Sequence, residues 1–309
     1  MSDKPSLIPL YERSPFTQLT VSLLIVMCTG LILFTAFLLA GTLIFNTDLQ
    51  VLENPSSVSG ENGIAFLKYV LISQDISFFI VPAIIILIKL KPLNQTGIFD
   101  LKIPHLDEIL LVVLLSFCIF PITNFTGQIN VGMNLPDWLS GVEQWMIEKE
   151  DNIDNLLELL ITQGTIGAVI LNIVIMSVLP AIGEELIFRG VFQKILYRLF
   201  RSGQAAVWVT AFIFSAIHFQ FFGFLPRFIL GLVFGYLFLW TRNLWLPILA
   251  HFVNNAVPTI SASTRDLEKI TSTADLSVWK QIIIIALPVL LSLIILLHFR
   301  NEGRKKFSG

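Results

Sequence analysis

The chain has 309 residues, of which 55% are hydrophobic and only 14% are charged, and its mean hydropathy is +0.79. Soluble domains carry about 25% charged residues, so this composition excludes an ordinary soluble protein. The net charge of -2, with no basic stripe along any segment, also excludes a nucleic-acid-binding surface.

Long stretches of low charge recur along the whole chain. No charged residue lies between Arg13 and Asp48, and about 20 apolar residues are enough for a helix to cross the hydrocarbon core of a membrane. The sequence therefore predicts an all-α protein, a polytopic transmembrane helix bundle of about eight spans. We expect the other spans at residues 69–88, 109–125, 159–179, 205–222, 228–240, 244–259 and 281–299.

Lysine and arginine are unevenly distributed between the segments that connect these spans. Cytoplasmic flanks of membrane spans carry an excess of both residues. With the N-terminus inside and eight crossings, most of them fall on the cytoplasmic side, and the acidic segment 127–158 falls on the other side. We expect an integral multi-pass protein in contact with the lipid bilayer, with both termini cytoplasmic. No repeat or flexible linker is visible, which predicts a single membrane domain over residues 1–309.

The acidic segment 127–158 also contains two tryptophans, Trp138 and Trp145. Tryptophan is enriched at membrane–water interfaces, where its ring is apolar and its N–H is polar. We expect either a short helix at the outer interface or a plain connecting loop.

Several polar residues lie within or next to the expected spans. A charged side chain there costs at least about 2.5–3.5 kcal/mol, so such a residue faces the bundle interior and is a candidate for function. Asp75 is the least defined of them, since it can pair with Lys68, line a cavity or bond a neighbouring helix. The complete set is Asp75, Glu184, Glu185, Arg189, His218, His251, Asn254 and Asn255.

The acidic pair follows Pro180, which we expect to interrupt one helix before the next begins with Glu184 and Glu185 in its first turn. Glu185 and Arg189 are four residues apart and share a helical face, whereas Glu184 points about 100° away from Glu185. One carboxylate can therefore be held by the arginine while the other stays free.

Glu184 and His218 are equally far along the chain from the polar turn at Arg201. An antiparallel helix hairpin around that turn places them at the same height, facing each other. His251 and Asn255 are four residues apart, so they offer an imidazole and an amide on one helical face. The simpler alternative is that both sets form hydrogen bonds that only hold helices together.

This combination of side chains matches the needs of amide hydrolysis in a water-poor site. The reaction requires an activated water, a proton shuttle and donors for the developing oxyanion. Glu184, His218 and His251 could instead hold a divalent metal such as zinc, because two nitrogens and a carboxylate form a catalytic ligand set. The sequence has no HExxH signature, and the residues leave both mechanisms open.

Three short signatures then point to a family. They are the Glu-Glu-x-x-x-Arg of residues 184–189, the Phe-x-x-x-His of residues 214–218 and the His-x-x-x-Asn of residues 251–255. Because the three signatures occur in this order, the chain resembles the CAAX-protease and bacteriocin-processing family. That family includes the CAAX prenyl protease 2, or Ras-converting, type. The resemblance covers about residues 170–258, and we expect a protease core at about 157–260.

The resemblance implies an intramembrane endopeptidase, commonly called a metalloprotease, although a metal-free glutamate mechanism is also proposed for the family. Glu184 is then the base that activates water and His218 assists it. His251 and Asn255 form the oxyanion side, and Glu185 and Arg189 position the site.

The implied substrate is a membrane-associated protein or peptide, of which a prenylated CAAX tail is one candidate. Similar bacterial proteins suggest a bacterial cell membrane as the location. The competing interpretations are a non-catalytic scaffold, a bacteriocin-immunity protein that uses the same polar cluster, and a secondary transporter. No inverted repeat supports the transporter.

Overall fold

The computed structural model describes residues 9–52, 60–90, 103–133, 135–161, 165–264 and 278–308, and these residues form helices and turns without any strand. The longer elements are α1 (Pro15–Phe45), α2 (Glu61–Asp75), α3 (Val81–Leu90), α4 (Leu106–Val131), α5 (Ser140–Leu160), α6 (Ile166–Ile173), α7 (Leu179–Glu185), α8 (Gln193–Phe200), α9 (Gly203–Ala216), α10 (Phe224–Thr241), α11 (Trp245–Thr264) and α13 (Val278–Ser308).

Shorter helical segments complete the described chain. Three are π-helical and continue directly into the α-helices on either side: η4 (Ile76–Ile80), η6 (Val174–Val178) and η7 (Leu186–Phe192). Three are single 3-10 turns: η1 (Leu10–Glu12), η2 (Leu49–Leu52) and η5 (Asp137–Leu139).

Among the described residues, six helices are long and apolar enough to cross a membrane: Pro15–Phe45, Glu61–Leu90, Leu106–Val131, Ile166–Phe200, Phe224–Thr241 and Ile285–Lys305. The prediction of an all-α transmembrane bundle is confirmed, and six spans agree approximately with the expected number of about eight. The two expected spans outside this set are α9, an apolar helix of 14 residues, and α11, which carries His251 and two asparagines.

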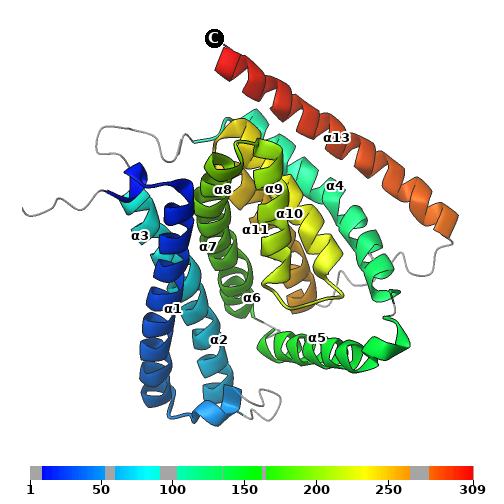
Figure 1. Ribbon diagram of the computed structural model, residues 1–309. Coiled ribbons are helices and arrows are strands. Elements are labelled where there is room, and N and C mark those ends of the chain that lie inside the picture. The colour runs from blue at the N-terminus through cyan, green and yellow to red at the C-terminus, as the bar shows by residue number, and fades with distance from the viewer. Residues whose placement is uncertain are drawn as a thin grey trace, which may run out of the picture.

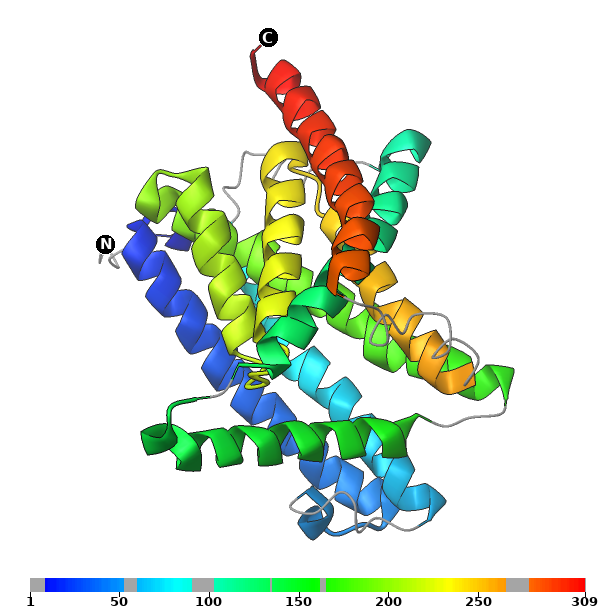
Figure 2. The ribbon, with the colours of Figure 1, turned by 90° about the vertical axis from the view of Figure 1, so that its right-hand side faces the viewer.

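The helices form a bundle in which α1 begins and α13 ends on the same side (Figure 1). Helix α5 lies across the opposite part of the bundle in both views (Figure 2). Much of the segment 127–158 therefore forms a helix and not a plain connecting loop. Its position at the outer interface stays a prediction.

The expected interruption at Pro180 was wrong, because the helix is continuous from residue 166 to residue 200. Proline removes one backbone donor, and its ring clashes with the carbonyl four residues earlier. Immediately before Pro180 the chain forms the π-helical segment η6, where the N–H of Leu179 donates to the carbonyl of Val174. This wider turn admits the proline ring without breaking the helix.

The turn between α8 and α9 sets the hairpin that carries the acidic pair and His218. Arg201 ends α8 in the left-handed conformation with φ of 52°. Ser202 then caps α9, where its Oγ accepts a hydrogen bond from the backbone N–H of Ala205 at 3.3 Å. The two helices consequently run antiparallel from a tight polar turn.

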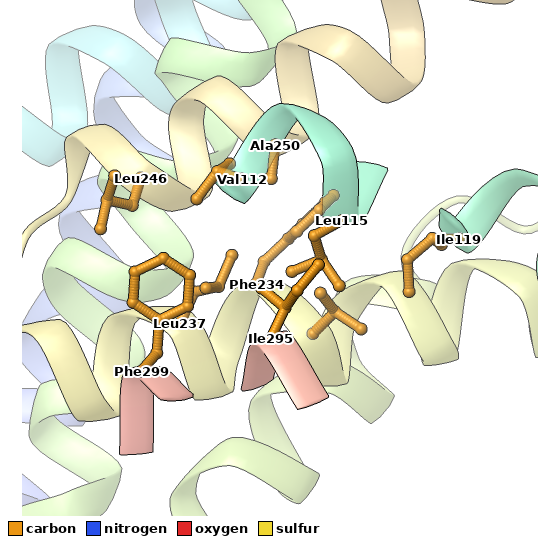
Figure 3. Close-up of a cluster of buried hydrophobic side chains, with 10 residues drawn as sticks. Val112, Leu115, Ile119, Phe234, Leu237, Leu246, Ala250, Ile295 and Phe299 are labelled. Carbon is orange, nitrogen blue, oxygen red and sulfur yellow. The ribbon is translucent and has the colours of Figure 1, made fainter. Parts of the chain in front are cut away.

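Two apolar clusters hold the bundle on either side of the polar residues. One joins α4, α10, α11 and α13 and includes Leu115, Phe234, Leu246 and Phe299 (Figure 3). The other joins α3, η7, α8 and α9 and includes Ile86 and Phe214. In a membrane, such packing fixes helix positions through close contact, because lipid offers no hydrophobic drive between helices.

Helices α9 and α10 approach each other closely at Gly231 and Gly235. A Cβ atom on Gly231 would lie 3.0 Å from the Cα of Ala211, and one on Gly235 would lie 2.9 Å from Val207 Cγ1. Small residues four apart allow helix backbones in membranes to approach in this way. The backbone carbonyls of both glycines also accept hydrogen bonds from η7 and α8, through Arg189 and Gln193.

Replacing Gly231 with Val should therefore destabilise the protein, because the new side chain must push α10 away from the backbone of α9. We expect a loss of about 1–3 kcal/mol, the usual cost of overpacking, measured as a lower thermal midpoint in detergent. Gly167→Ala is the matched control, since a Cβ there meets nothing within 4 Å. Equal midpoints for both variants would contradict this packing.

Candidate active site

Glu184, His218 and His251 come together from three different helices. Glu184 lies in α7, His218 follows the end of α9, and His251 lies in α11. Glu184 Oε2 is 4.0 Å from His218 Nε2 and 3.9 Å from His251 Nε2. The side chains of Glu184 and His218 remain 11% and 25% exposed, so the group is reachable from one edge.

Each imidazole is oriented by a hydrogen bond of its other nitrogen. His218 Nδ1 lies 2.7 Å from the carbonyl oxygen of Phe214, and His251 Nδ1 lies 3.0 Å from Glu185 Oε1. Both partners accept hydrogen bonds, so each Nδ1 carries the proton and donates it. In the neutral rings the lone pairs of Nε2 then face Glu184.

Glu185 is the acceptor that links the acidic pair to α11. Its Oε1 receives a hydrogen bond from Arg189 Nη1 at 2.7 Å in addition to the one from His251. Arg189 is 0% exposed, and its Nη2 donates to the carbonyl of Gly231 at 3.0 Å. The ion pair thus joins η7 to α10 and α11 and fixes the orientation of His251.

Aromatic rings enclose the two histidines and the guanidinium. Phe234 stacks on His251 with ring centroids 5.1 Å apart, and Phe214 meets both His218 and His251 edge-on. The guanidinium of Arg189 lies 4.8 Å from the Phe214 centroid and 5.4 Å from the Phe234 centroid. Phe234 was not foreseen, because an aromatic residue in an apolar helix carries no signal of its neighbours.

The two asparagines of α11 differ in their surroundings. The buried Asn254 uses its side chain within its own helix, where Nδ2 donates to the carbonyl of Ala250 at 2.8 Å. Asn255 is half-buried and lies one turn beyond His251. Within the described ranges its side chain makes no hydrogen bond to Glu184 or either histidine, so its amide is free to meet a ligand.

Glu184, His218 and His251 offer the oxygen and nitrogen atoms that a divalent metal prefers, but the distances between these atoms do not suit a metal site. Metal–nitrogen and metal–oxygen bonds to zinc are about 2.0–2.1 Å, so a metal joining atoms 3.9–4.0 Å apart needs an angle of about 150° instead of a tetrahedral one. Among the residues described, no group of three or more His, Cys, Asp or Glu side chains is arranged to hold a metal. A water at hydrogen-bond distances of about 2.8 Å reaches both atoms of each pair.

A second set of buried polar contacts links α2, α6 and α11 away from Glu184. Lys68 Nζ donates to Asn172 Oδ1 at 3.0 Å, and Asn172 Nδ2 donates to Ser263 Oγ at 3.2 Å. Ser177 and Thr259 form a further contact at 3.3 Å. Lys68 is therefore bonded to α6. Asn172 was not among the expected site residues, although it is a polar residue in an apolar stretch.

The exposed edge of the group lies next to α5. Phe221, in the turn after His218, packs its ring against Trp145 of α5 with centroids 5.6 Å apart. Arg227 at the start of α10 donates from Nη1 to the carbonyl of Gln220 at 3.3 Å and also bonds the Gln220 side chain. Burial raises the pKa of Glu150 in α5, while the charge of Arg227 opposes that change. Helix α5 thus packs against the turn that follows His218.

Comparison with known proteins places the three signatures in one family. Residues 166–257 match the family model described as type II CAAX prenyl endopeptidase Rce1-like. This segment is similar to an Rce1-like domain. All three signatures lie within the matched segment, so the resemblance expected from the sequence is confirmed, and the chain is a multi-pass membrane protein.

A curated relative is less informative about activity. The "Uncharacterized protein YpbD" of Bacillus subtilis (strain 168) is 33% identical over 90 residues, which is 28% of this chain and 43% of that protein. The match therefore spans less than half of the relative. No solved structure matches the chain.

The buried ion pair can be tested by removing its cation. Arg189→Met leaves the Glu185 carboxylate buried without its partner, and we expect the free energy of unfolding to fall by about 3–5 kcal/mol. Adding Glu185→Gln removes the stranded charge and should return part of that stability. Thermal unfolding in detergent measures both, and an equal loss in the single and double variants would contradict this role for the pair.

Proposed function

We propose that this protein is an intramembrane endopeptidase that hydrolyses a peptide bond of a membrane-associated protein or peptide with a water molecule activated by Glu184. The observation that supports this proposal most strongly is the environment of Glu184 Oε2. This atom is buried and has no hydrogen-bond partner among the described residues, and it faces the Nε2 atoms of two histidines. The Rce1-like match over residues 166–257 supports the same reaction class.

In this mechanism Glu184 acts as the general base. Its carboxylate takes a proton from water while the water oxygen attacks the scissile carbonyl carbon, and the protonated carboxyl later gives that proton to the leaving amine. His218 assists from the other side of the water. Its Nδ1 proton is held by a neutral backbone carbonyl, so its Nε2 lone pair is available to accept a hydrogen bond.

His251 serves the oxyanion. The Glu185 carboxylate lies 3.0 Å from His251 Nδ1 and holds the ring with Nε2 toward the site. The amide of Asn255, one turn away, is a second donor for the same oxygen. This arrangement stabilises the charge that develops in the transition state. Glu185 and Arg189 position His251 and take no proton themselves.

The membrane location restricts the substrate to a protein or peptide at or within the bilayer. A prenylated CAAX tail is the first candidate, because the matched family is described as prenyl endopeptidases. We further propose a bacterial cell membrane, because the curated relative is bacterial. The lysine and arginine distribution favours both termini in the cytoplasm.

Glu184→Gln tests this proposal. Loss of a general base lowers a rate by about 10²–10⁴-fold, and we expect such a loss in cleavage of a quenched fluorescent peptide by the full-length protein in detergent. Glu302→Gln is the matched control, because Glu302 pairs with Lys305 at the C-terminal end of α13. Peptides with and without a prenylated cysteine, compared in parallel, identify the substrate class.

A metal chelator separates the two candidate mechanisms in the same assay. Activity that persists with chelator supports glutamate-activated water, whereas activity that is lost and then restored by zinc identifies a metal site at Glu184, His218 and His251. Absence of cleavage by folded wild-type protein with every peptide would contradict an endopeptidase and favour a scaffold or immunity protein.

A further inference from the structure

Asp75 is a buried carboxylate that the proposed mechanism does not use. It is the last residue of α2 and is only 8% exposed. Within the described part of the chain its side chain forms no hydrogen bond and no ion pair. A carboxylate in the interior of a membrane protein is expensive to keep without a partner, so its retention calls for a functional explanation.

The packing of α7 brings Asp75 next to the site. Helix α7 lies against α2 and η4 at Gly183, the residue before Glu184. A Cβ atom on Gly183 would lie only 3.0 Å from Phe79 Cβ and 3.8 Å from the carbonyl oxygen of Asp75. Asp75 and Glu184 thus lie next to the point where the two helices make their close contact.

Three buried or half-buried basic residues around the site donate to acceptors other than Asp75. Lys68 of α2 donates to Asn172, Arg189 of η7 to Glu185 and Arg227 of α10 to Gln220. The helix also widens into the π-helical segment η4 immediately after Asp75. Such turns are frequent at functional sites.

We propose that Asp75 is a substrate-binding residue of this site, whose carboxylate accepts a hydrogen bond from an N–H donor of the bound peptide beside the scissile bond. The donor is either a backbone amide or a basic side chain of the peptide, and both complete the hydrogen bonding that the protein leaves open. This role rests on the proposed endopeptidase function.

The first experiment does not depend on activity. Two nearby carboxylates without a cation repel each other, so Asp75→Asn should raise the Tm of the full-length protein in detergent by about 2 °C or more. In a Glu184→Gln background the same substitution should raise Tm less, because the repulsion is already gone. Ser73→Ala, on the same helix and with its hydroxyl bonded to Tyr69, is the control.

The second experiment measures cleavage. Asp75→Asn should lower kcat/KM by about tenfold or more although the protein is at least as stable, a combination that a purely structural residue does not produce. Peptides with lysine or norleucine beside the bond that wild-type protein cleaves then separate the two donors. A loss confined to the lysine peptide identifies a side-chain donor, and an equal loss in both identifies a backbone amide.

Two results would overturn the proposal. A lower Tm for Asp75→Asn, independent of Glu184→Gln, would mean that Asp75 stabilises the fold and is not coupled to the site. Unchanged kcat/KM with both peptides would mean that Asp75 does not contact substrate. If no variant or wild-type protein cleaves any peptide, the proposed function fails, and the Tm comparison still decides whether the two carboxylates are coupled.

Discussion

The buried ion pair between Glu185 and Arg189 is the interaction on which the rest of the site depends. A charge in the interior of a membrane protein has no water to solvate it, so its partners must come from the protein. Glu185 satisfies Arg189 and His251 together, and Arg189 also binds the carbonyl of Gly231. One charge pair therefore fixes the relative positions of three helices and the orientation of a histidine.

Next to this carboxylate, which is ion-paired through Oε1, lie two carboxylates that have no lysine or arginine partner among the described residues. Glu184 has an orphaned oxygen that faces two imidazoles, and Asp75 has no partner among the described residues. Proteins tolerate such groups where a ligand completes them, at a cost in stability that well-packed regions offset. The apolar clusters on both sides of the site supply that packing. The site thus combines a buried ion pair, Glu185–Arg189, with two carboxylates, Glu184 and Asp75, that can accept hydrogen bonds from water and peptide.

The π-helical segments determine how the charged residues of the site are oriented. Helices α2 and α7 both widen into a π-helical segment directly after an acidic residue, Asp75 in one case and Glu185 in the other. A π-helical turn inserts an extra residue and rotates everything beyond it relative to a regular helix. Such a turn also carries the chain through Pro180 without a break. Side chains beyond the end of each turn therefore face directions that regular helix geometry does not give.

The sequence by itself determined the properties that depend on local spacing. Apolar runs specify an all-α membrane bundle, the four-residue separation of Glu185 and Arg189 specifies their ion pair, and equal distances from Arg201 bring Glu184 opposite His218. Only the tertiary structure decided which groups meet across helices, such as Asp75 beside Glu184. The physical reason is that spacing within a helix follows from its pitch, whereas contacts between helices depend on how each one is rotated and packed.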